Sequence, residues 1–232
     1  MDIKFLLDLA FRRRTLIRAL AEYELKILVH QYSWESVECI LIAGGAKDRG
    51  SEQVLVTQCR SAQVVSVNVD PDCQPQILCD LERPWPVKNE AFDCIVSMWV
   101  LEHLKEPNHF ADEACRVLTA KGRIILSVPF IHRVHGSPQD FLRYTDSYLY
   151  LMLSRYGFTN ISIRPIGGGP FLAAVSLLWP LFKLPLLGLI FATAAAMGDS
   201  LLVLLSRTTG RGRKLVHSYP IAYLLFAEKT MQ

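Results

Sequence analysis

One short segment of the chain gathers side chains that could move a proton. His132 and His135 precede Asp140, Arg143 and Tyr144 in the run HRVHGSPQDFLRYT. An imidazole can accept a proton near neutral pH, and a carboxylate can hold it in the correct orientation. We therefore predict that His135 is a general base, that Asp140 orients it, and that His132 is a further catalytic candidate. In the alternative interpretation, Asp140, Arg143 and Tyr144 form a structural cluster that holds this segment in place.

A second set of candidate residues lies at the ends of apolar runs. These glycine and polar residues are Gly44, Gly45, Asn68, Asp70 and Asp80. Glycine lets a backbone approach a ligand closely, and a carboxylate or amide oxygen can accept a hydrogen bond from a ribose hydroxyl. Each of these residues is also typical of an ordinary turn. They indicate a ligand site only because they follow successive predicted strands in the order expected for one.

Seven short apolar runs predict the strands that position these residues. They span residues 39–43, 64–69, 75–78, 92–98, 123–128, 161–164 and 221–227. Helical patterns at 107–118 and 146–156 lie between them, and residues 3–30 have the spacing of one or two amphipathic helices. This alternation predicts an α/β fold with a doubly wound, mostly parallel sheet that is covered on both faces.

Composition and charge argue against a nucleic-acid-binding protein and against a metal site made of cysteines. The chain has 232 residues and a net charge of +3, without the dense basic stripe of a nucleic-acid-binding protein. Its six cysteines form no C-x-x-C pair, so we expect no metal site from spacing and interpret the thiols as reduced core residues. We expect no nucleic-acid partner.

Three segments carry a resemblance to a known family. FDCIVSMWVLEHLKEP, EACRVLTAKGRIILSVPF and HGSPQDFLRYT are similar to motifs of the type 11 family of class I S-adenosylmethionine-dependent methyltransferases, over about residues 39–170. More narrowly, they resemble a subgroup found beside polysaccharide and cell-envelope genes. The resemblance implies a Rossmann-like sheet of order 3-2-1-4-5-7-6 with strand seven antiparallel, and S-adenosylmethionine as cofactor.

The resemblance also implies a cofactor pocket at the carboxyl ends of the early strands. Its expected residues are Gly44, Gly45, Asn68, Asp70, Asp80, Leu81, Met98, Trp99 and Val100. The glycines would underlie the methionine part, Asn68 would meet the ribose, and Asp80 with Leu81 would face the adenine. The glycine motif departs from the family at Ile42 and Ala46, and the usual acid of strand two is Asn68. These departures predict weaker cofactor binding.

Residues 171–206 are almost entirely apolar, with Lys183 and Asp199 as the only charges. We expect a hydrophobic helical insertion between the last two strands that lies as a shallow hairpin in one membrane leaflet, interrupted at Pro185 and Asp199. Arg207, Arg211, Arg213 and Lys214 would then meet lipid headgroups. A lid over the acceptor site, a homodimer contact and a spanning helix are the alternatives.

The expected organisation is amphipathic helices at 1–34, a methyltransferase core at 35–170, the insertion at 171–213 and a returning strand at 214–232. The expected function is methyl transfer to a small or lipid-linked acceptor, with a glycan as one candidate, at the cytoplasmic face of the membrane. The alternative is a non-catalytic scaffold protein that docks on a membrane or partner through the insertion.

Overall fold

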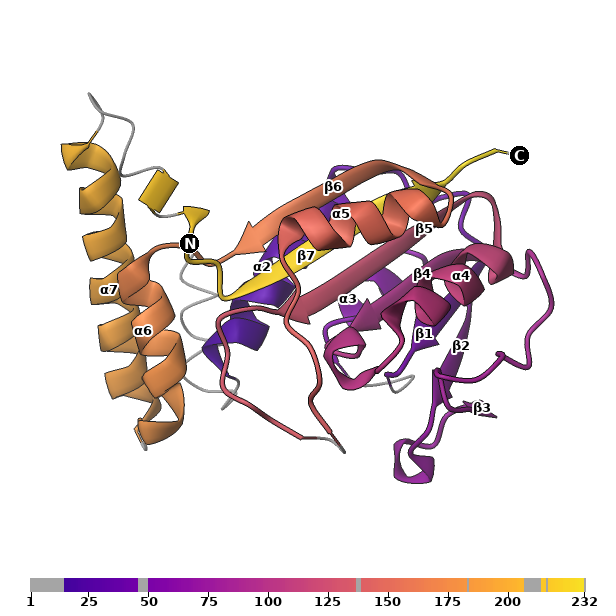
Figure 1. Cartoon of the computed structure of the whole chain (residues 1–232), viewed down its shortest axis with the longest axis horizontal. Helices are drawn as coiled ribbons and strands as arrows, with labels where there is room; N and C mark the ends of the chain where they lie inside the picture. The colour runs from indigo at the N-terminus through magenta and orange to yellow at the C-terminus, as the bar shows by residue number, and fades with distance from the viewer. Residues whose placement is uncertain are drawn as a thin grey trace. The chain divides into compact units, whose positions relative to one another are not determined.

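Among the described residues, seven strands form one sheet in the order β3-β2-β1-β4-β5-β7-β6 (Figure 1). The strands are β1 (Cys39–Ala43), β2 (Gln63–Asn68), β3 (Ile77–Leu78), β4 (Phe92–Met98), β5 (Leu118–Pro129), β6 (Phe158–Ile166) and β7 (Ala222–Lys229). The computed structural model describes residues 15–45, 50–136, 139–182, 184–206, 214–215 and 217–231. Ala46, Arg207, Arg211 and Arg213, to which the sequence-based predictions refer, lie outside the described residues.

The sheet is mixed. Strands β1 to β5 pair in parallel, β1 with β2 and β4, β2 with β3, and β4 with β5. Strand β7 runs the other way, because Ile221 N donates to Ile166 O while Thr230 N donates to Gly157 O, so one partner rises in number as the other falls. The predicted α/β sheet with an antiparallel strand seven is confirmed.

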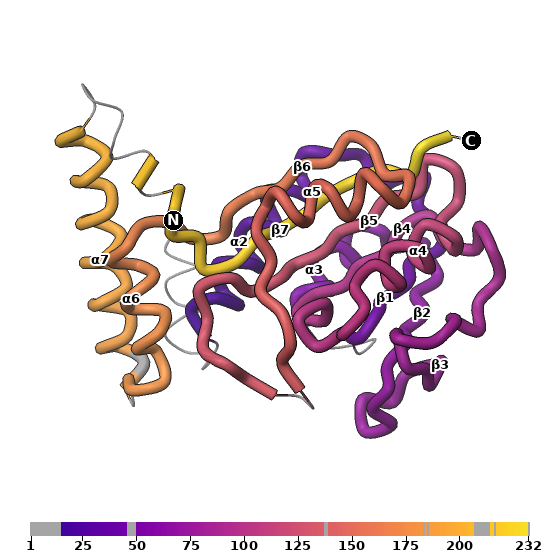
Figure 2. Tube along the Cα trace, in the orientation of Figure 1, coloured from indigo at the N-terminus to yellow at the C-terminus, as the bar shows by residue number. Residues whose placement is uncertain are grey.

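The described helices alternate with these strands (Figure 2). They are α2 (Leu16–His30), α3 (Gln53–Val56), η1 (Pro71–Cys73), η2 (Leu101–His103), α4 (Pro107–Val117), α5 (Asp146–Arg155), α6 (Pro170–Leu178), η3 (Trp179–Leu181) and α7 (Pro185–Leu205). Figure 1 shows α4 and α5 on one face of the sheet and α3 on the other, which is why β1 and β4 are buried along nearly their whole length.

Local sequence accounts for the helices that flank the core. Pro107 occupies the first turn of α4, where its missing N–H costs no hydrogen bond. Thr145 caps α5 through its side-chain oxygen, which accepts from Tyr148 N. Phe110 and Val117, on one face of α4, are fully buried.

The chain divides into two compact units. Unit 1 comprises Met1–Glu24, Pro129–Arg133 and Pro165–Tyr223, and unit 2 comprises Leu25–Val128, Val134–Arg164 and Leu224–Gln232. Unit 2 holds all the candidate cofactor residues, together with His135 and Asp140. His132 belongs to unit 1.

In unit 1, α6 and α7 form a hairpin that Asp199 closes. Its two carboxylate oxygens accept hydrogen bonds from Phe171 N at 3.1 Å and Leu172 N at 2.9 Å, so it caps the N-terminus of α6. A Cβ at Gly169 would lie only 2.1 Å from the Asp199 Cγ, so glycine is required there. The predicted interruptions are wrong, because Pro185 begins α7 and Asp199 lies within the unbroken helix.

Five of the strands have bounds that differ from the predicted ones, namely β2, β3, β5, β6 and β7. Residues 119–122, which separate the predicted helix at 107–118 from the predicted strand at 123–128, are part of β5, which begins at Leu118 and pairs with β4 through a register shift between Phe92 and Cys94. Lys121, at φ +63°, absorbs that irregularity. The third predicted strand shortens to two residues at the sheet edge, where β3 has a neighbour on one side only.

Candidate functional site

A glycine turn follows β1 at the point where the strand order reverses. Strand β1 lies between β2 and β4, and the chain leaves it through Gly44. Gly44 has φ +81°, and its N–H donates to Val67 O at 2.7 Å. A Cβ on Gly44 would lie 2.5 Å from Val100 Cγ2. In open α/β sheets ligands bind at such switch points, beyond the carboxyl ends of the strands.

Asn68 fastens this turn. Its Nδ2 donates to Gly44 O at 2.9 Å and to Gly45 O at 3.3 Å, and its Oδ1 accepts from Asp70 N at 3.0 Å. Both amide hydrogens therefore bind backbone carbonyls. The side chain that was predicted to meet a ribose holds the glycine turn against β2, and one lone pair of Oδ1 is left for a ligand.

The two aspartates of the predicted pocket are engaged locally. Asp70 Oδ1 accepts from Asp72 N at 2.9 Å, which starts η1. Asp80 Oδ1 accepts from Glu82 N at 3.0 Å. The second oxygen of Asp70 accepts from Cys73 Sγ at 3.7 Å, and that of Asp80 lies 3.8 Å from Arg83 Nε. Because a carboxylate oxygen has two lone pairs and the Asp80 side chain is 43% exposed, both aspartates can still accept a hydrogen bond from a ligand.

Three buried apolar residues and one buried hydrogen-bond donor also belong to the predicted cofactor pocket. Leu81, Met98 and Val100 are buried. Trp99 sits between β4 and η2 with φ +62°, a conformation that costs a side-chain-bearing residue roughly 1–2 kcal/mol. Its indole Nε1 is buried and has no hydrogen-bond partner among the described residues. A strained residue with an unused buried donor is typical of a ligand site.

Sequence reasoning missed Glu52, which lies beside the glycine turn. Its side chain is buried, and its Oε1 would be 3.0 Å from a Cβ on Gly45. Gly50, at φ +105°, leaves the space that the other carboxylate oxygen fills, because a Cβ there would lie 2.0 Å from Oε2. The structure thus places a carboxylate beside a turn whose strand acids are absent at Ile42 and Asn68. The only sequence signal was an acidic residue shortly after a glycine at a helix start.

The segment after β5 is joined to η2 by backbone and side-chain hydrogen bonds. Tyr144 donates its hydroxyl to Leu101 O at 2.7 Å, and Phe141 N donates to Glu102 O at 2.8 Å. Burial raises the pKa of the Tyr144 hydroxyl well above its usual value. Tyr144 therefore remains protonated and serves as a structural donor.

Asp140 lies at the centre of this segment. Arg143 grips its carboxylate with two nitrogens, at 2.5 and 2.7 Å, and these hydrogen bonds hold the pKa of Asp140 well below its usual range. The same carboxylate accepts from His135 N at 2.8 Å and lies 3.2 Å from His135 Nδ1. The structure thus brings the predicted base and its predicted orienting residue together.

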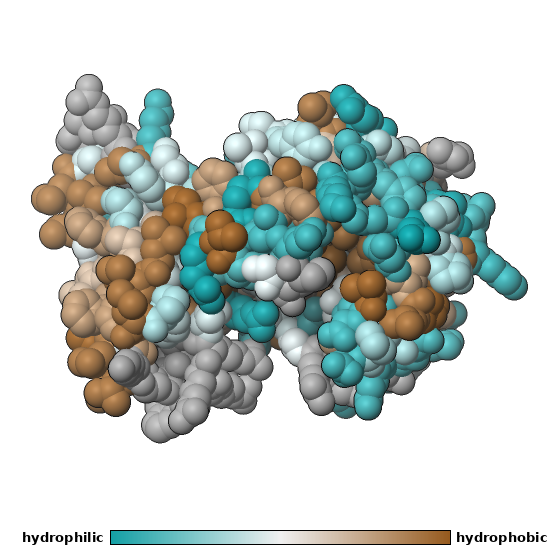
Figure 3. All heavy atoms as spheres, turned by 60° about the horizontal axis from the view of Figure 1, so that its bottom comes forward, coloured by the Kyte–Doolittle hydropathy of each residue, from teal (hydrophilic) through white to brown (hydrophobic). Residues whose placement is uncertain are grey.

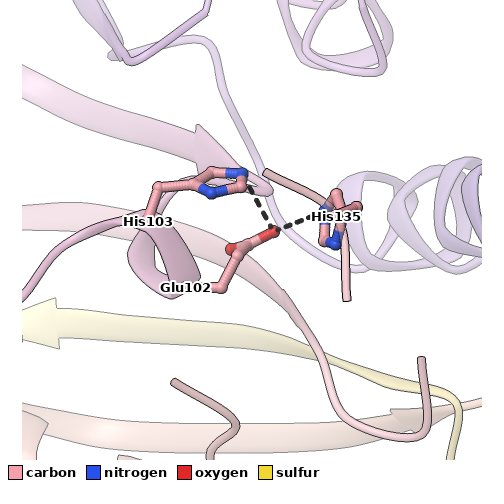
Figure 4. A group of neighbouring side chains, drawn as sticks. All are labelled: Glu102, His103 and His135. Carbon is pink, nitrogen blue, oxygen red and sulfur yellow. Dashed lines mark ion pairs between the residues drawn. The ribbon is translucent and has the colours of Figure 1, made fainter. Parts of the chain in front are cut away.

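Glu102, His103 and His135 converge beside Asp140, and we call them the Glu102 cluster (Figure 4). The Glu102 side chain is fully buried, and its Oε1 lies 3.8 Å from His103 Nε2 and 3.7 Å from His135 Nε2. Sequence spacing did not predict this cluster, because His135 comes from a different segment of the chain. His132, in unit 1, donates its backbone N–H to Phe130 O at 3.0 Å.

Comparison with known proteins gives a family match and a fold. Residues 47–126 match the methyltransferase domain family described as type 11, while no curated protein matches the chain. A methyltransferase structure from Archaeoglobus fulgidus, described as SAM dependent, is 14% identical and has a TM-score of 0.56, with 98% of this chain and 100% of that chain covered.

Two further solved structures share the fold. Phosphoethanolamine N-methyltransferase 2 of Haemonchus contortus, solved with S-adenosylhomocysteine and phosphomonomethylethanolamine, is 14% identical with a TM-score of 0.53. The match covers all of this chain and 61% of that one. The cyclase SpnF is 17% identical, with a TM-score of 0.55 and coverage of 95% and 84%. The chain therefore has the fold of the class I S-adenosylmethionine-dependent methyltransferases, and its segment 47–126 matches a methyltransferase domain.

Proposed function

We propose that this chain binds S-adenosylmethionine at the carboxyl ends of β1, β2 and β4 and transfers its methyl group to an acceptor. The observation that carries the proposal is the Gly44 turn, held in the left-handed region at the strand-order reversal. The family match over residues 47–126 and the S-adenosylhomocysteine bound in the Haemonchus contortus relative support this choice of cofactor.

Residues of unit 2 supply the contacts that such a cofactor needs. The Gly44–Gly45 backbone would approach the methionine part, and the Glu52 carboxylate would attract the cofactor's ammonium group. Leu81 and Met98 would pack on the adenine, and the buried indole N–H of Trp99 would donate a hydrogen bond to the cofactor. Asn68 acts mainly by holding the turn.

Methyl transfer itself depends mainly on positioning. A lone pair of the acceptor forms the new bond to the methyl carbon while the carbon–sulfur bond breaks, and the sulfur leaves with that electron pair as S-adenosylhomocysteine. A hydroxyl or amine acceptor must also lose a proton. The role of His135 and Asp140 in removing it stays a prediction, since the Nε2 that would accept the proton faces Glu102 at 3.7 Å.

The exposed apolar surface of the α6–α7 hairpin supports a location of the acceptor at a membrane. Residues on its outer surface are at least 44% exposed although they are apolar: Phe171, Leu177, Leu178, Leu181, Leu184, Leu186, Leu187, Ile190, Phe191, Met197, Leu201, Leu204 and Leu205. Figure 3 shows hydrophobic side chains gathered over this hairpin. Apolar area on this scale is typical of a lipid or protein contact, and four basic residues follow it in the sequence at 207–214.

The geometry of the hairpin favours peripheral contact over spanning. Leu186–Leu205 is long and apolar enough to cross a membrane by length and composition, and 22% of its apolar window is buried. However, α6 has nine residues, or about 14 Å. Ile166 and Ile221, on either side of the hairpin, are hydrogen bonded to each other, so the chain must return to the side it left. We propose that the hairpin lies in one leaflet at the cytoplasmic face and that the acceptor is small or lipid-linked, with envelope glycans as candidates.

A thermal-shift experiment on the full chain tests the cofactor. S-adenosylmethionine and S-adenosylhomocysteine should each raise the melting temperature, because a ligand at 100 times its Kd stabilises the folded state by about 2.7 kcal/mol. ATP at the same concentration is the control for general nucleotide binding. An unchanged melting temperature at millimolar cofactor, or an equal rise with ATP, would favour the non-catalytic scaffold.

Vesicle sedimentation tests the membrane contact. We expect Leu186→Glu and Met197→Glu, at sites 64% and 69% exposed, to release the chain from anionic phospholipid vesicles without unfolding it. Leu78→Glu, at a site 62% exposed on β3, is the matched control and should still sediment. If the hairpin variants sediment as well as the control, the hairpin does not contact the membrane.

A further inference from the structure

The Glu102 cluster joins three groups that can each bind a cation. One carboxylate oxygen of Glu102 and one ring nitrogen each of His103 and His135 all lie within 4.8 Å of one another. Glu102 comes from η2 at the end of β4 and His135 from the segment after β5, and the carboxylate has no solvent exposure. The histidine side chains are 15% and 27% exposed, so a small solute can reach the cluster.

Hydrogen bonding at the other ring nitrogens sets which atoms face the carboxylate. His103 Nδ1 lies 2.5 Å from Gln139 O, and a carbonyl only accepts, so Nδ1 carries the proton. A neutral His103 then presents the lone pair of Nε2 to Glu102. His135 Nδ1 lies 3.2 Å from Asp140 Oδ2 and its Nε2 lies 3.7 Å from Glu102 Oε1, so each ring nitrogen of His135 is close to a carboxylate.

This arrangement matches the surroundings of metal-binding histidines. Such histidines usually donate the second ring N–H to a backbone carbonyl or a carboxylate, which fixes both the tautomer and the ring orientation. His103 has the carbonyl of Gln139, and the Asp140 carboxylate lies 3.2 Å from His135 Nδ1. Arg143 in turn donates two hydrogen bonds to the Asp140 carboxylate. Arg143 therefore fixes the position of the carboxylate that lies beside His135.

A cation would also strengthen the electrostatics of the cluster. The fully buried Glu102 carboxylate already interacts with the charge of Arg143, and a cation between the carboxylate and the two imidazoles would compensate its charge at shorter range. Ligand atoms about 2.0–2.2 Å from one ion lie roughly 3–3.5 Å apart. The two histidine–carboxylate separations are 3.8 and 3.7 Å and all three ligand atoms lie within 4.8 Å of one another, so side-chain movement of up to about an ångström would close the site.

We propose that Glu102, His103 and His135 bind one divalent transition-metal cation. Two imidazoles and one carboxylate are ligands that suit zinc, cobalt or iron and leave further positions for water or a ligand oxygen. The ion would tie the segment after β5 to η2. When it is bound, His135 Nε2 is a metal ligand and not a base. This proposal does not depend on cofactor binding or methyl transfer.

Equilibrium binding of Zn²⁺ and Co²⁺ to the chelator-stripped full chain tests the site. We expect one tight equivalent in the wild type and affinity at least about tenfold weaker in His103→Gln and His135→Gln. His30→Gln removes an exposed histidine on α2, whose Nδ1 lies 2.8 Å from Lys26 O, and should bind as the wild type does. Circular dichroism checks that each variant is folded.

The Co²⁺ absorption spectrum of the wild type identifies the type of ligand atom, even if a variant fails to fold. Nitrogen and oxygen ligands give visible d–d bands without the near-ultraviolet charge-transfer band of a cobalt–thiolate bond. A thiolate band from the bound equivalent would assign the ion to the cysteines and overturn the proposal. The proposal is also overturned if the stripped wild type binds no ion at micromolar concentration, or if folded variants bind as tightly as the wild type.

Discussion

Two regions of unit 2 lie at the carboxyl ends of neighbouring strands, yet they use polar side chains in opposite ways. At the glycine turn after β1, the amide of Asn68 is bound to the backbone, so we propose that the ligand contacts would come mainly from backbone groups and from Glu52. In the Glu102 cluster, ring nitrogens and a carboxylate face one another. In the first region the polar side chains fix the shape of the backbone, and in the second they bring charged and titratable groups together.

The largest effect is expected from a substitution that distorts the glycine turn after β1. Gly44→Val should destabilise the fold by about 3 kcal/mol, combining left-handed strain with overpacking, because its Cβ would lie 2.5 Å from Val100 Cγ2. It should also abolish the thermal shift with S-adenosylmethionine.

A matched glycine controls for backbone strain alone. Gly157 also has φ +81°, but a Cβ there would meet only Cys115 Sγ at 3.5 Å. Gly157→Ala should therefore cost about 1–2 kcal/mol in urea unfolding and leave the cofactor shift intact. Equal losses in the two variants would show that packing against Val100 is unimportant.

A smaller effect tests whether Asn68 is a structural residue or a weakened ligand residue. In Asn68→Asp, a carboxylate would replace the amide that donates to two carbonyls, so we expect a loss of about 1–3 kcal/mol and weaker cofactor binding. Urea unfolding and titration calorimetry with S-adenosylhomocysteine measure the two quantities. Tighter binding by the aspartate variant would instead assign Asn68 to the ribose.

The smallest effect on stability is expected at Trp99. Its buried indole N–H makes no hydrogen bond to the described residues, so Trp99→Phe should change the free energy of unfolding by less than about 1 kcal/mol. Cofactor affinity should fall several-fold, because the proposed donor is lost. If calorimetry finds the affinity unchanged, the indole nitrogen does not contact the cofactor.

Much of the fold followed from local patterns in the sequence. The runs at 39–43 and 92–98 coincide with β1 and β4, because strands buried on both faces need uninterrupted apolar residues. Thr145 directly precedes the helical pattern at 146–156 and caps α5. The start of β5 at Leu118 was missed, because a bulge lets polar residues such as Lys121 continue a strand.

The candidate site was predictable only where residues are close in sequence. Gly44 and Gly45 follow a strand directly, and His135 and Asp140 share one short segment, so their proximity is local. The positions of Glu52 against Gly45 and of His103 beside His135 depend on how separate segments pack. No spacing rule in one sequence encodes such contacts.

The amino-acid sequence by itself determined the alternation of strands and helices, the glycine turn and the long apolar segment, because each depends on periodicity or on a single residue's backbone freedom. The tertiary structure alone decided that Asn68 holds the turn, that Asp199 caps α6, and that Glu102 faces two histidines. Which polar group meets which is fixed by packing, since a buried donor or acceptor takes the partner that the fold brings within reach.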